Sequence, residues 1–221
     1  MKEEISSRQQ LLWGLLIVVL VSIVGTALWM RQGGHLRQQA GSERPLEGLG
    51  IFGKVPEFSL VERSGRRMGL ADFLGKVWIV NFIYTHCPDS CPIQSAQMKE
   101  LQSEFGGEKN LRLVSITVDP RRDSTEVLQE YANRFEANPQ RWFFLTGEQD
   151  AIYRLAQQGF RLGAAEIPQE KRDQSGATHA HSPRFVLVDE QAQIRGYYPG
   201  TDKEALLRLR RDLRVLLRGG K

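Results

Sequence analysis

The sequence predicts an α/β domain in which helices flank a central mixed β-sheet. Two observations support this fold class. Segments 77–84 and 111–118 are nearly continuous apolar runs rich in β-forming residues, as in strands buried on both faces. Segments with a helical spacing of apolar residues alternate with these runs, and a strand pair and an amphipathic segment follow them.

A short hairpin opens the predicted domain, with a strand near 55–60 and a turn at Ser64-Gly65. The first buried strand leads into a helix that begins near two prolines. Either Pro88 or Pro92 fits a first helical residue, where a missing N–H costs nothing.

Further helices are predicted over 124–135, with Ser124 as the cap, and over 150–158. Two short strands follow at 185–188 and 194–198. The chain then ends in a helix with leucines three and four residues apart, and its arginines are expected on a solvated face. This order of elements is that of a thioredoxin-like fold.

Length and composition fit one ordinary domain with additional segments. The 221 residues are 41% hydrophobic and 25% charged, and the formal net charge is only +4. The sequence contains no nucleic-acid-binding motif, so we expect no nucleic-acid partner. Two cysteines are too few to stabilise a domain of this size, so their role is expected to be local and chemical.

The N-terminal part predicts a membrane anchor. After a short segment, 1–10, residues 11–30 form an uncharged run of 20 residues, long enough to span a bilayer as a helix and longer than the apolar part of a signal peptide. Residues 31–50 are polar and glycine-rich and predict a tether, and 51–221 form the folded domain. The flanking basic residues do not determine the orientation.

The cysteines lie where the first buried strand gives way to a helix. Cys87 and Cys91 are four residues apart, so in a helical turn they project to one side. Sites in open α/β sheets favour the carboxyl ends of strands, and a helix N-terminus makes a thiol more acidic. The pair is therefore expected to bind a metal or to perform redox chemistry.

Thiolates select Cu(I), Zn(II) or iron–sulfur clusters, but two cysteines alone complete neither a zinc site nor a cluster. Two thiolates and one imidazole make a plausible three-coordinate Cu(I) site. His35 lies in the tether and is set aside, and His86 points away from Cys87 as its neighbour. His179 and His181 are expected in the loop just before strand 185–188, the third strand of the core, and in a thioredoxin-like fold this loop faces the cysteine motif. The residues alone leave both histidines open as the third ligand.

The cysteine segment and several later segments resemble those of a known family. The segment Tyr84-Thr85-His86-Cys87-Pro88-Asp89-Ser90-Cys91-Pro92 is similar to the signature of the SCO/SenC copper-binding proteins of cytochrome oxidase assembly. Ser115–Asp123, Leu145-Thr146-Gly147 and His181-Ser182 before Phe185–Asp189 extend the resemblance, which covers about 52–218.

The resemblance implies a thioredoxin-like domain that binds copper through Cys87, Cys91 and His181 and helps to build the dinuclear copper centre of cytochrome c oxidase. The implied partners are the copper-bearing oxidase subunit and another periplasmic copper chaperone or a thiol reductase. The implied location is the bacterial inner membrane, with a single span and the soluble domain in the periplasm.

Two positions depart from the family pattern. Ala180 stands where many relatives have an aspartate, so a carboxylate expected beside His181 is missing. Pro183 falls where thioredoxins place a cis-proline, and we hypothesise that the Ser182–Pro183 bond is cis. Asp89 is interpreted as a helix-start residue and Asp119 as a turn or capping residue.

A thiol–disulfide oxidoreductase is the alternative function, in which Cys87 attacks or resolves a disulfide of a client protein. The fold and the cysteines at a helix start favour it. The three intervening residues and the presence of His181 argue against it, because a pure reductase needs no such histidine. A peroxidase and an inert structural disulfide are weaker interpretations.

Overall fold

The computed structural model describes residues 13, 16–22, 49–171 and 177–219 of the chain. It divides into two compact units, Met1–Pro45 and Leu46–Lys221. In the first unit, the described residues 13 and 16–22 are helical, and the large apolar side chains among them are 47–66% exposed. Within the described residues, no helix combines the length and apolar character that crossing a bilayer requires. Most of the predicted span 11–30 lies outside them, so the anchor stays a prediction.

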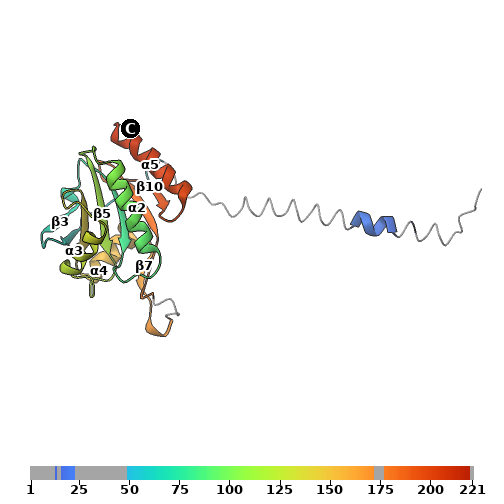
Figure 1. The fold of residues 1–221 in the computed structure, drawn as a ribbon, viewed down its shortest axis with the longest axis horizontal. Coiled ribbons are helices and arrows are strands. Elements are labelled where there is room, and N and C mark those ends of the chain that lie inside the picture. Colours follow the sequence, from blue (N-terminus) through green and yellow to red (C-terminus); the bar gives the residue numbers. More distant parts are fainter. Residues whose placement is uncertain (1–12, 14–15, 23–48, 172–176, 220–221) are drawn as a thin grey trace, which may run out of the picture. The chain divides into compact units, whose positions relative to one another are not determined.

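An eight-stranded mixed sheet forms the centre of the second unit (Figure 1). The strand order is β1-β10-β9-β4-β5-β6-β2-β3. Their bounds are β1 Gly53–Lys54, β2 Ser59–Glu62, β3 Arg67–Gly69, β4 Val77–Ile83, β5 Leu111–Thr117, β6 Trp142–Thr146, β9 Arg184–Val188 and β10 Gln193–Pro199.

Parallel and antiparallel pairs are combined in this sheet. Strand β4 runs parallel to β5, which runs parallel to β6, whereas β9 is antiparallel to β4 and β10. All seven residues of β4 are buried, as expected for a strand covered on both faces. The topology confirms the predicted thioredoxin-like α/β fold.

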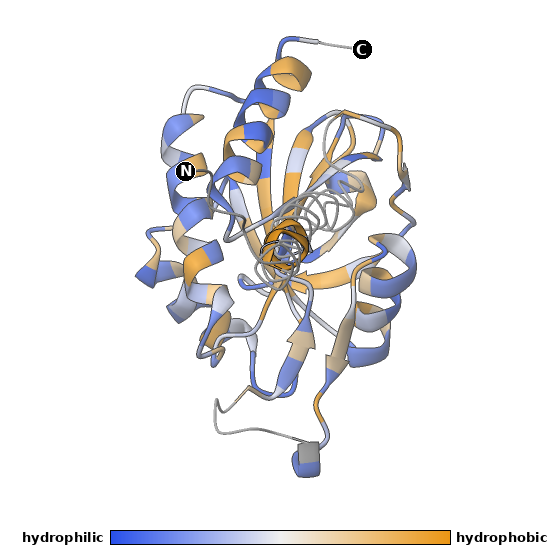
Figure 2. Ribbon diagram, turned by 90° about the vertical axis from the view of Figure 1, so that its right-hand side faces the viewer, coloured by the Kyte–Doolittle hydropathy of each residue, from blue (hydrophilic) through white to orange (hydrophobic). Residues whose placement is uncertain are grey.

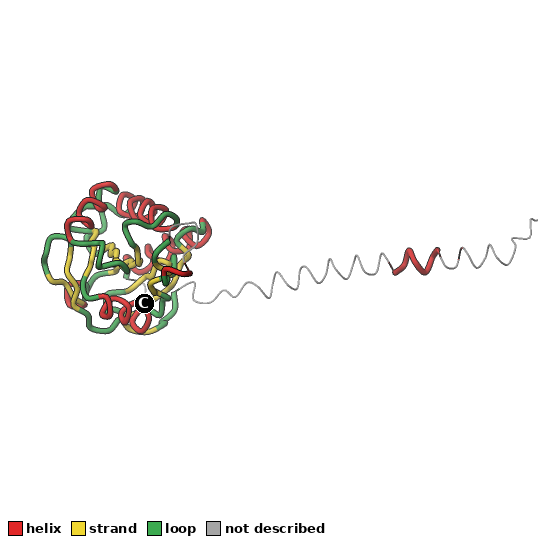
Figure 3. The backbone as a smooth tube through the Cα atoms, turned by 90° about the horizontal axis from the view of Figure 1, so that it is seen from below, coloured by secondary structure: helices red, strands yellow, loops and turns green. Residues whose placement is uncertain are grey.

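Helices flank both faces of the sheet (Figure 3). Helices α2 (Ser90–Glu104), α3 (Thr125–Arg134) and α5 (Lys203–Leu217) share one face: Ser95 of α2 hydrogen-bonds to Tyr131 of α3 at 2.9 Å, and Arg210 of α5 bridges to Glu100 and Glu104. Figure 2 shows hydrophilic residues along the outside of the helices and an apolar layer of strands between them.

The opposite face is covered by aromatic packing. Helix α4 (Gln149–Arg154) continues as a π-helical turn, η2 (Leu155–Gly159), which leads to Phe160. The Phe160 ring lies 6.0 Å from Trp78 and 5.6 Å from Phe82, both on β4. Such edge-to-face contacts add about 0.5–1.5 kcal/mol each to the burial of the rings, so they fix α4 and η2 against the sheet.

A chain of polar side chains crosses the core beneath α2. Trp142 Nε1 donates to Ser115 Oγ at 3.0 Å, and Ser115 donates to Asn81 Oδ1 at 2.8 Å. Asn81 Nδ2 in turn donates to Gln94 Oε1 at 3.4 Å. Buried polar groups need such partners, and this chain ties β6, β5 and β4 to the first turns of α2.

Most predicted elements are confirmed to within a few residues. The exceptions have local causes. Neither proline begins α2: Asp89 is the N-cap, Ser90 is the first helical residue, and Pro92 is the third, still within the turn whose N–H groups lack intrahelical acceptors. Strand β6 was not predicted, although Trp142–Thr146 is mostly apolar and each of its residues is buried.

A separate two-stranded sheet stands beside the main one. Strands β7 (Ala164–Glu166) and β8 (His179–His181) pair antiparallel, with Ala164 opposite His181 and Glu166 opposite His179. The segment that was expected to be a loop before the third strand is therefore a strand itself. Two residues separate it from β9.

Candidate metal centre

The cysteine segment is held at the carboxyl end of β4. The strand ends at Ile83, and the backbone N–H of Cys87 donates to the carbonyl of Tyr84 at 3.2 Å, closing a tight turn. Helix α2 begins at Ser90, so Cys91 is its second residue and lies in the positive field of the helix N-terminus. Cys87 is 9% exposed and Cys91 is completely buried.

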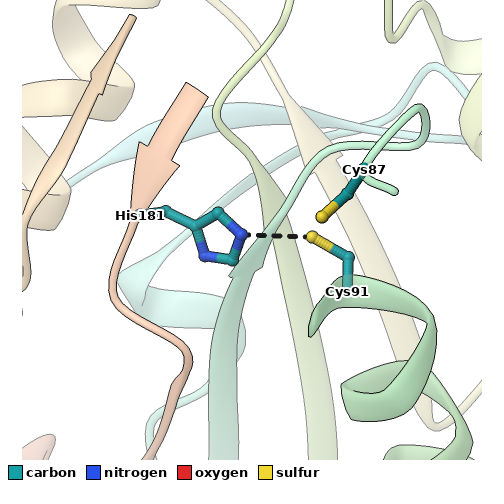
Figure 4. A group of neighbouring side chains, drawn as sticks. All are labelled: Cys87, Cys91 and His181. Atoms are coloured by element: carbon teal, nitrogen blue, oxygen red, sulfur yellow. Dashed lines mark hydrogen bonds between the residues drawn. The ribbon is translucent and has the colours of Figure 1, made fainter. Parts of the chain in front are cut away.

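The third candidate ligand, His181, is the last residue of strand β8. Side chains alternate along a strand, so His179 and His181 point to one side and Ala180 to the other. The burial follows this alternation: Ala180 is exposed, His179 is buried and His181 is partly buried. The imidazole of His181 points at the two sulfur atoms (Figure 4).

Three donor atoms converge at this place. One ligand atom each from Cys87, Cys91 and His181 lie within 4.8 Å of one another, and Cys91 Sγ is 3.1 Å from His181 Nε2. Both cysteines are free thiols. Among the described residues, this is the one cluster of three or more such side chains close enough to hold a metal ion.

The two cysteines have shifted pKa values of opposite direction. A hydrogen bond from the Cys91 thiol is the main cause that lowers the pKa of Cys87 to about 3, against the effect of burial. Hydrogen bonds from His181 and from the backbone N–H groups of Asp89 and Cys91 lower it further. The same hydrogen bond, together with burial, raises the pKa of Cys91. At neutral pH the pair is therefore one thiolate and one thiol.

Tyr84 packs between the two histidines. Its ring centroid is 5.4 Å from that of His179 and 5.8 Å, edge-on, from that of His181. Burial, and then a hydrogen bond to Cys87, raises the pKa of the Tyr84 phenol, so it stays a neutral hydroxyl. The ring thus fixes both imidazoles relative to the cysteine turn.

A buried carboxylate anchors the same turn from the other side. Asp123 is completely buried and accepts from the Thr85 hydroxyl at 2.6 Å, the Thr85 N–H at 3.1 Å and the Thr117 hydroxyl at 2.5 Å. Burial raises the pKa of Asp123, and these hydrogen bonds oppose the rise. Sequence reasoning assigned no role to Tyr84, Thr85 or Asp123; their polar or aromatic character at strand ends was the available signal.

The other candidates lie outside the cluster. His86 is exposed and bonds to Thr85, whereas His179 faces Asp119, with Nδ1 and Oδ2 3.8 Å apart. Asp89 is the N-cap residue of α2 without a side-chain capping bond, and the Asp119 carbonyl accepts from two N–H groups of the following turn, as interpreted. His35 lies outside the described residues.

Two predictions concern the surroundings of His181. The described peptide bonds are all trans, so the hypothesis of a cis Ser182–Pro183 bond is wrong. The carboxylate that Ala180 replaces is missed in the structure, because His181 Nδ1 is buried and has no hydrogen-bond partner. Metal-binding histidines usually donate their second nitrogen to such a partner. Here the ring is held by its contact with Tyr84 instead.

The donor set suits a soft metal ion. Two sulfur donors and one imidazole nitrogen favour Cu(I) over hard cations such as Mg²⁺ or Ca²⁺. One sulfur is already ionised, and the other lies beside it. The residues present therefore fit a copper ion without requiring a further protein ligand.

The comparisons with known proteins agree with this site. A profile of the SCO1/SenC family matches residues 52–214. The chain belongs to the SCO1/SenC family. It is 30% identical to the SCO1 protein homolog of Bacillus subtilis over 151 residues, which is 67% of this chain and 75% of that protein.

Solved structures of the family have the same fold. The structure of Bradyrhizobium japonicum ScoI with copper bound matches with a TM-score of 0.60 and 25% identity, over 72% of this chain and 99% of that chain. The structure of BsSco, a member of the Sco family of cytochrome c oxidase assembly proteins with a disulfide switch, matches with a TM-score of 0.64 and 25% identity, over 79% and 98%.

Proposed function

We propose that this protein is a copper metallochaperone that binds copper through Cys87, Cys91 and His181 and delivers it during assembly of the dinuclear copper centre of cytochrome c oxidase. The observation that carries the proposal is the convergence of the three donor atoms within 4.8 Å. The copper-bound ScoI structure and the assembly role of BsSco support the metal and the process. The copper-bearing subunit of the oxidase is the proposed recipient.

The site suits transfer as well as binding. His181 is partly exposed and Cys87 is 9% exposed, whereas Cys91 is completely buried, so a partner's thiol or imidazole can replace the ligands one at a time. Cys87 is a thiolate before the metal arrives, and only the Cys91 proton has to leave when both sulfur atoms bind. Another periplasmic copper chaperone or a thiol reductase is the proposed upstream partner.

Copper affinity of single variants tests this function. We expect His181→Ala, Cys87→Ser and Cys91→Ser each to weaken Cu(I) binding by more than about a hundredfold, beyond the 10- to 100-fold typical of outer-sphere substitutions. Competition with a chromophoric Cu(I) chelator measures the affinity. His179→Gln is the matched control, since it changes an imidazole on the same strand outside the cluster. Unchanged affinity in His181→Ala would contradict the ligand assignment.

A thiol–disulfide oxidoreductase remains the second candidate, because a thiolate and a thiol lie side by side. In that reaction the Cys87 thiolate attacks a client disulfide, and Cys91 then resolves the mixed disulfide. The client is reduced to two thiols while Cys87 and Cys91 are oxidised to a disulfide. In the mixed disulfide Cys87 is no longer a thiolate, but burial still raises the pKa of Cys91 and slows the second step. Reductase activity that survives in His181→Ala while copper binding is lost would separate the two functions.

We further infer that residues 11–30 anchor the chain in the bacterial inner membrane, with the domain in the periplasm. The uncharged run of 20 residues supports this location, as does the exposure of the described apolar side chains within it. An alkaline phosphatase fused after Lys221 tests it, because that enzyme is active only in the periplasm. An inactive fusion, with an active cytoplasmic reporter at the same position, would contradict this topology.

A further inference from the structure

His86 is the one exposed histidine among the described residues, and it directly precedes Cys87. Consecutive Cα atoms are about 3.8 Å apart, so the backbone of His86 adjoins that of Cys87 although its imidazole is not part of the three-donor cluster. Cys87 is 9% exposed and Cys91 is buried. The exposed imidazole is therefore accessible to a metal ion in solution, one residue away from the more exposed of the two cysteines.

The hydrogen bonds around Thr85 determine the tautomer of this imidazole. Thr85 has a single hydroxyl hydrogen. It is donated to Asp123 Oδ1 at 2.6 Å, where the buried carboxylate needs a donor. The Thr85 oxygen lies 3.0 Å from His86 Nδ1 and can only accept there. The hydrogen of a neutral His86 is therefore on Nδ1.

In this tautomer His86 Nε2 is free to bind a metal ion. A neutral imidazole with hydrogen on Nδ1 carries its lone pair on Nε2. Metal-binding histidines are typically oriented in this way, with the second nitrogen donating to an oxygen that is itself hydrogen-bonded. His86 has the supporting partner that His181 lacks, since the Nδ1 of His181 is buried without one.

We propose that His86 is a transient copper ligand that captures the ion at the mouth of the site and passes it to Cys87, and that Thr85 and Asp123 position it for this step. The inference rests on the proposed copper function. In the exchange, the Cu–N bond to His86 breaks as the Cu–S bond to Cys87 forms, and copper keeps its oxidation state. The Cys91 proton leaves to solvent when its sulfur completes the site. Delivery to a partner follows the reverse path.

The kinetics of Cu(I) transfer test this role with the full 221-residue chain. Cu(I) is offered as its bicinchoninate complex, and the colour loss is followed by stopped flow. We expect His86→Ala to slow uptake by about tenfold while the equilibrium affinity stays within about twofold of wild type, because the three permanent donors remain. Thr85→Ala is expected to slow uptake as well, and Thr85→Ser, which keeps the hydroxyl, to restore it.

A second measurement requires no metal. Nitrogen-15 NMR of the imidazole groups in the copper-free chain reports the tautomer of His86, and we expect hydrogen on Nδ1 in wild type and in Thr85→Ser. Hydrogen on Nε2 in wild type would overturn the positioning by Thr85. Wild-type uptake rates in His86→Ala would overturn the capture role alone. A wild-type chain that binds no Cu(I) would overturn the copper function itself.

Discussion

Asp123 accepts hydrogen bonds from both the hydroxyl and the backbone N–H of Thr85, at 2.6 and 3.1 Å. Thr85 stands two residues before Cys87, and Asp123 lies in the turn that follows β5. This pair of bonds therefore links the cysteine turn to a neighbouring parallel strand. The position of the first thiolate depends on a carboxylate that takes no part in the donor set.

Replacing this carboxylate is expected to destabilise the domain. Asp123→Asn removes one acceptor oxygen, so a buried hydroxyl or N–H loses its partner at a cost of about 1–3 kcal/mol in the free energy of unfolding. Urea denaturation measures this cost. The exposed Asp89→Asn is the matched control and should stay within about 0.5 kcal/mol of wild type. Equal stability of the two variants would contradict the anchoring role of Asp123.

The reactivity of Cys87 should be nearly independent of pH. With its pKa lowered to about 3, the thiol is ionised throughout the range from pH 5 to 8. We expect its alkylation rate to change less than about twofold in this range. The thiolate fraction of a thiol with a pKa near 8.5, by contrast, falls about tenfold for each pH unit below that pKa. Mass spectrometry of the Cys87 peptide after iodoacetamide treatment measures the rate.

Cys91→Ala tests the cause of this acidity. It removes the hydrogen bond that lowers the pKa of Cys87 most, so the pKa should rise. The alkylation rate of Cys87 in this variant should then fall measurably from pH 8 to 5. A rate in Cys91→Ala that is as flat as in wild type would show that the thiol of Cys91 is not the main donor.

The buried polar chain beneath α2 should be sensitive to its central hydroxyl. Ser115→Ala leaves Trp142 Nε1 without its acceptor and Asn81 Oδ1 without its donor. We expect a loss of about 1–3 kcal/mol in the free energy of unfolding, because both groups stay buried. Thermal and urea unfolding measure it. Ser103→Ala, on the exposed side of the same α2 helix, should be close to neutral.

Tyr84 provides a test of how the imidazoles are held. Tyr84→Ala removes a buried ring and should cost about 3–5 kcal/mol in stability, as other large aromatic truncations do. It should also weaken Cu(I) binding, because His181 loses its packing partner. Tyr84→Phe keeps the ring and should bind Cu(I) as wild type does. A large loss of affinity in Tyr84→Phe would assign the effect to the hydroxyl instead.

The long, strongly patterned elements could be predicted from the sequence. Strands β4 and β5 are mostly apolar, and the helix spacing of α3 and α5 is clear, so their existence and type are confirmed. Strand β6 was missed because Trp142–Thr146 is a short, mostly apolar run. Such a run does not distinguish a strand from part of a helix. The hairpin of β7 and β8 has three residues per strand, too few for any periodicity.

The site was predictable only in part. The spacing of Cys87 and Cys91 predicted that their side chains converge, but the choice between His179 and His181 depended on the family resemblance. Both histidines lie on the same side of β8, so alternation alone could not separate them. The roles of Thr85 and Asp123 depend on contacts between residues 38 positions apart, which local sequence patterns do not encode.

The three donors belong to parts of the domain that share no strand ladder. The thiols are attached to β4 and α2, next to the main sheet, whereas His181 belongs to the separate β7–β8 pair. A bound ion would join Cys91 to a residue 90 positions away. It would cross-link the two sheets reversibly and stabilise the folded state by mass action. Loading and unloading of the ion would then strengthen and weaken the attachment of the β7–β8 pair to the main sheet.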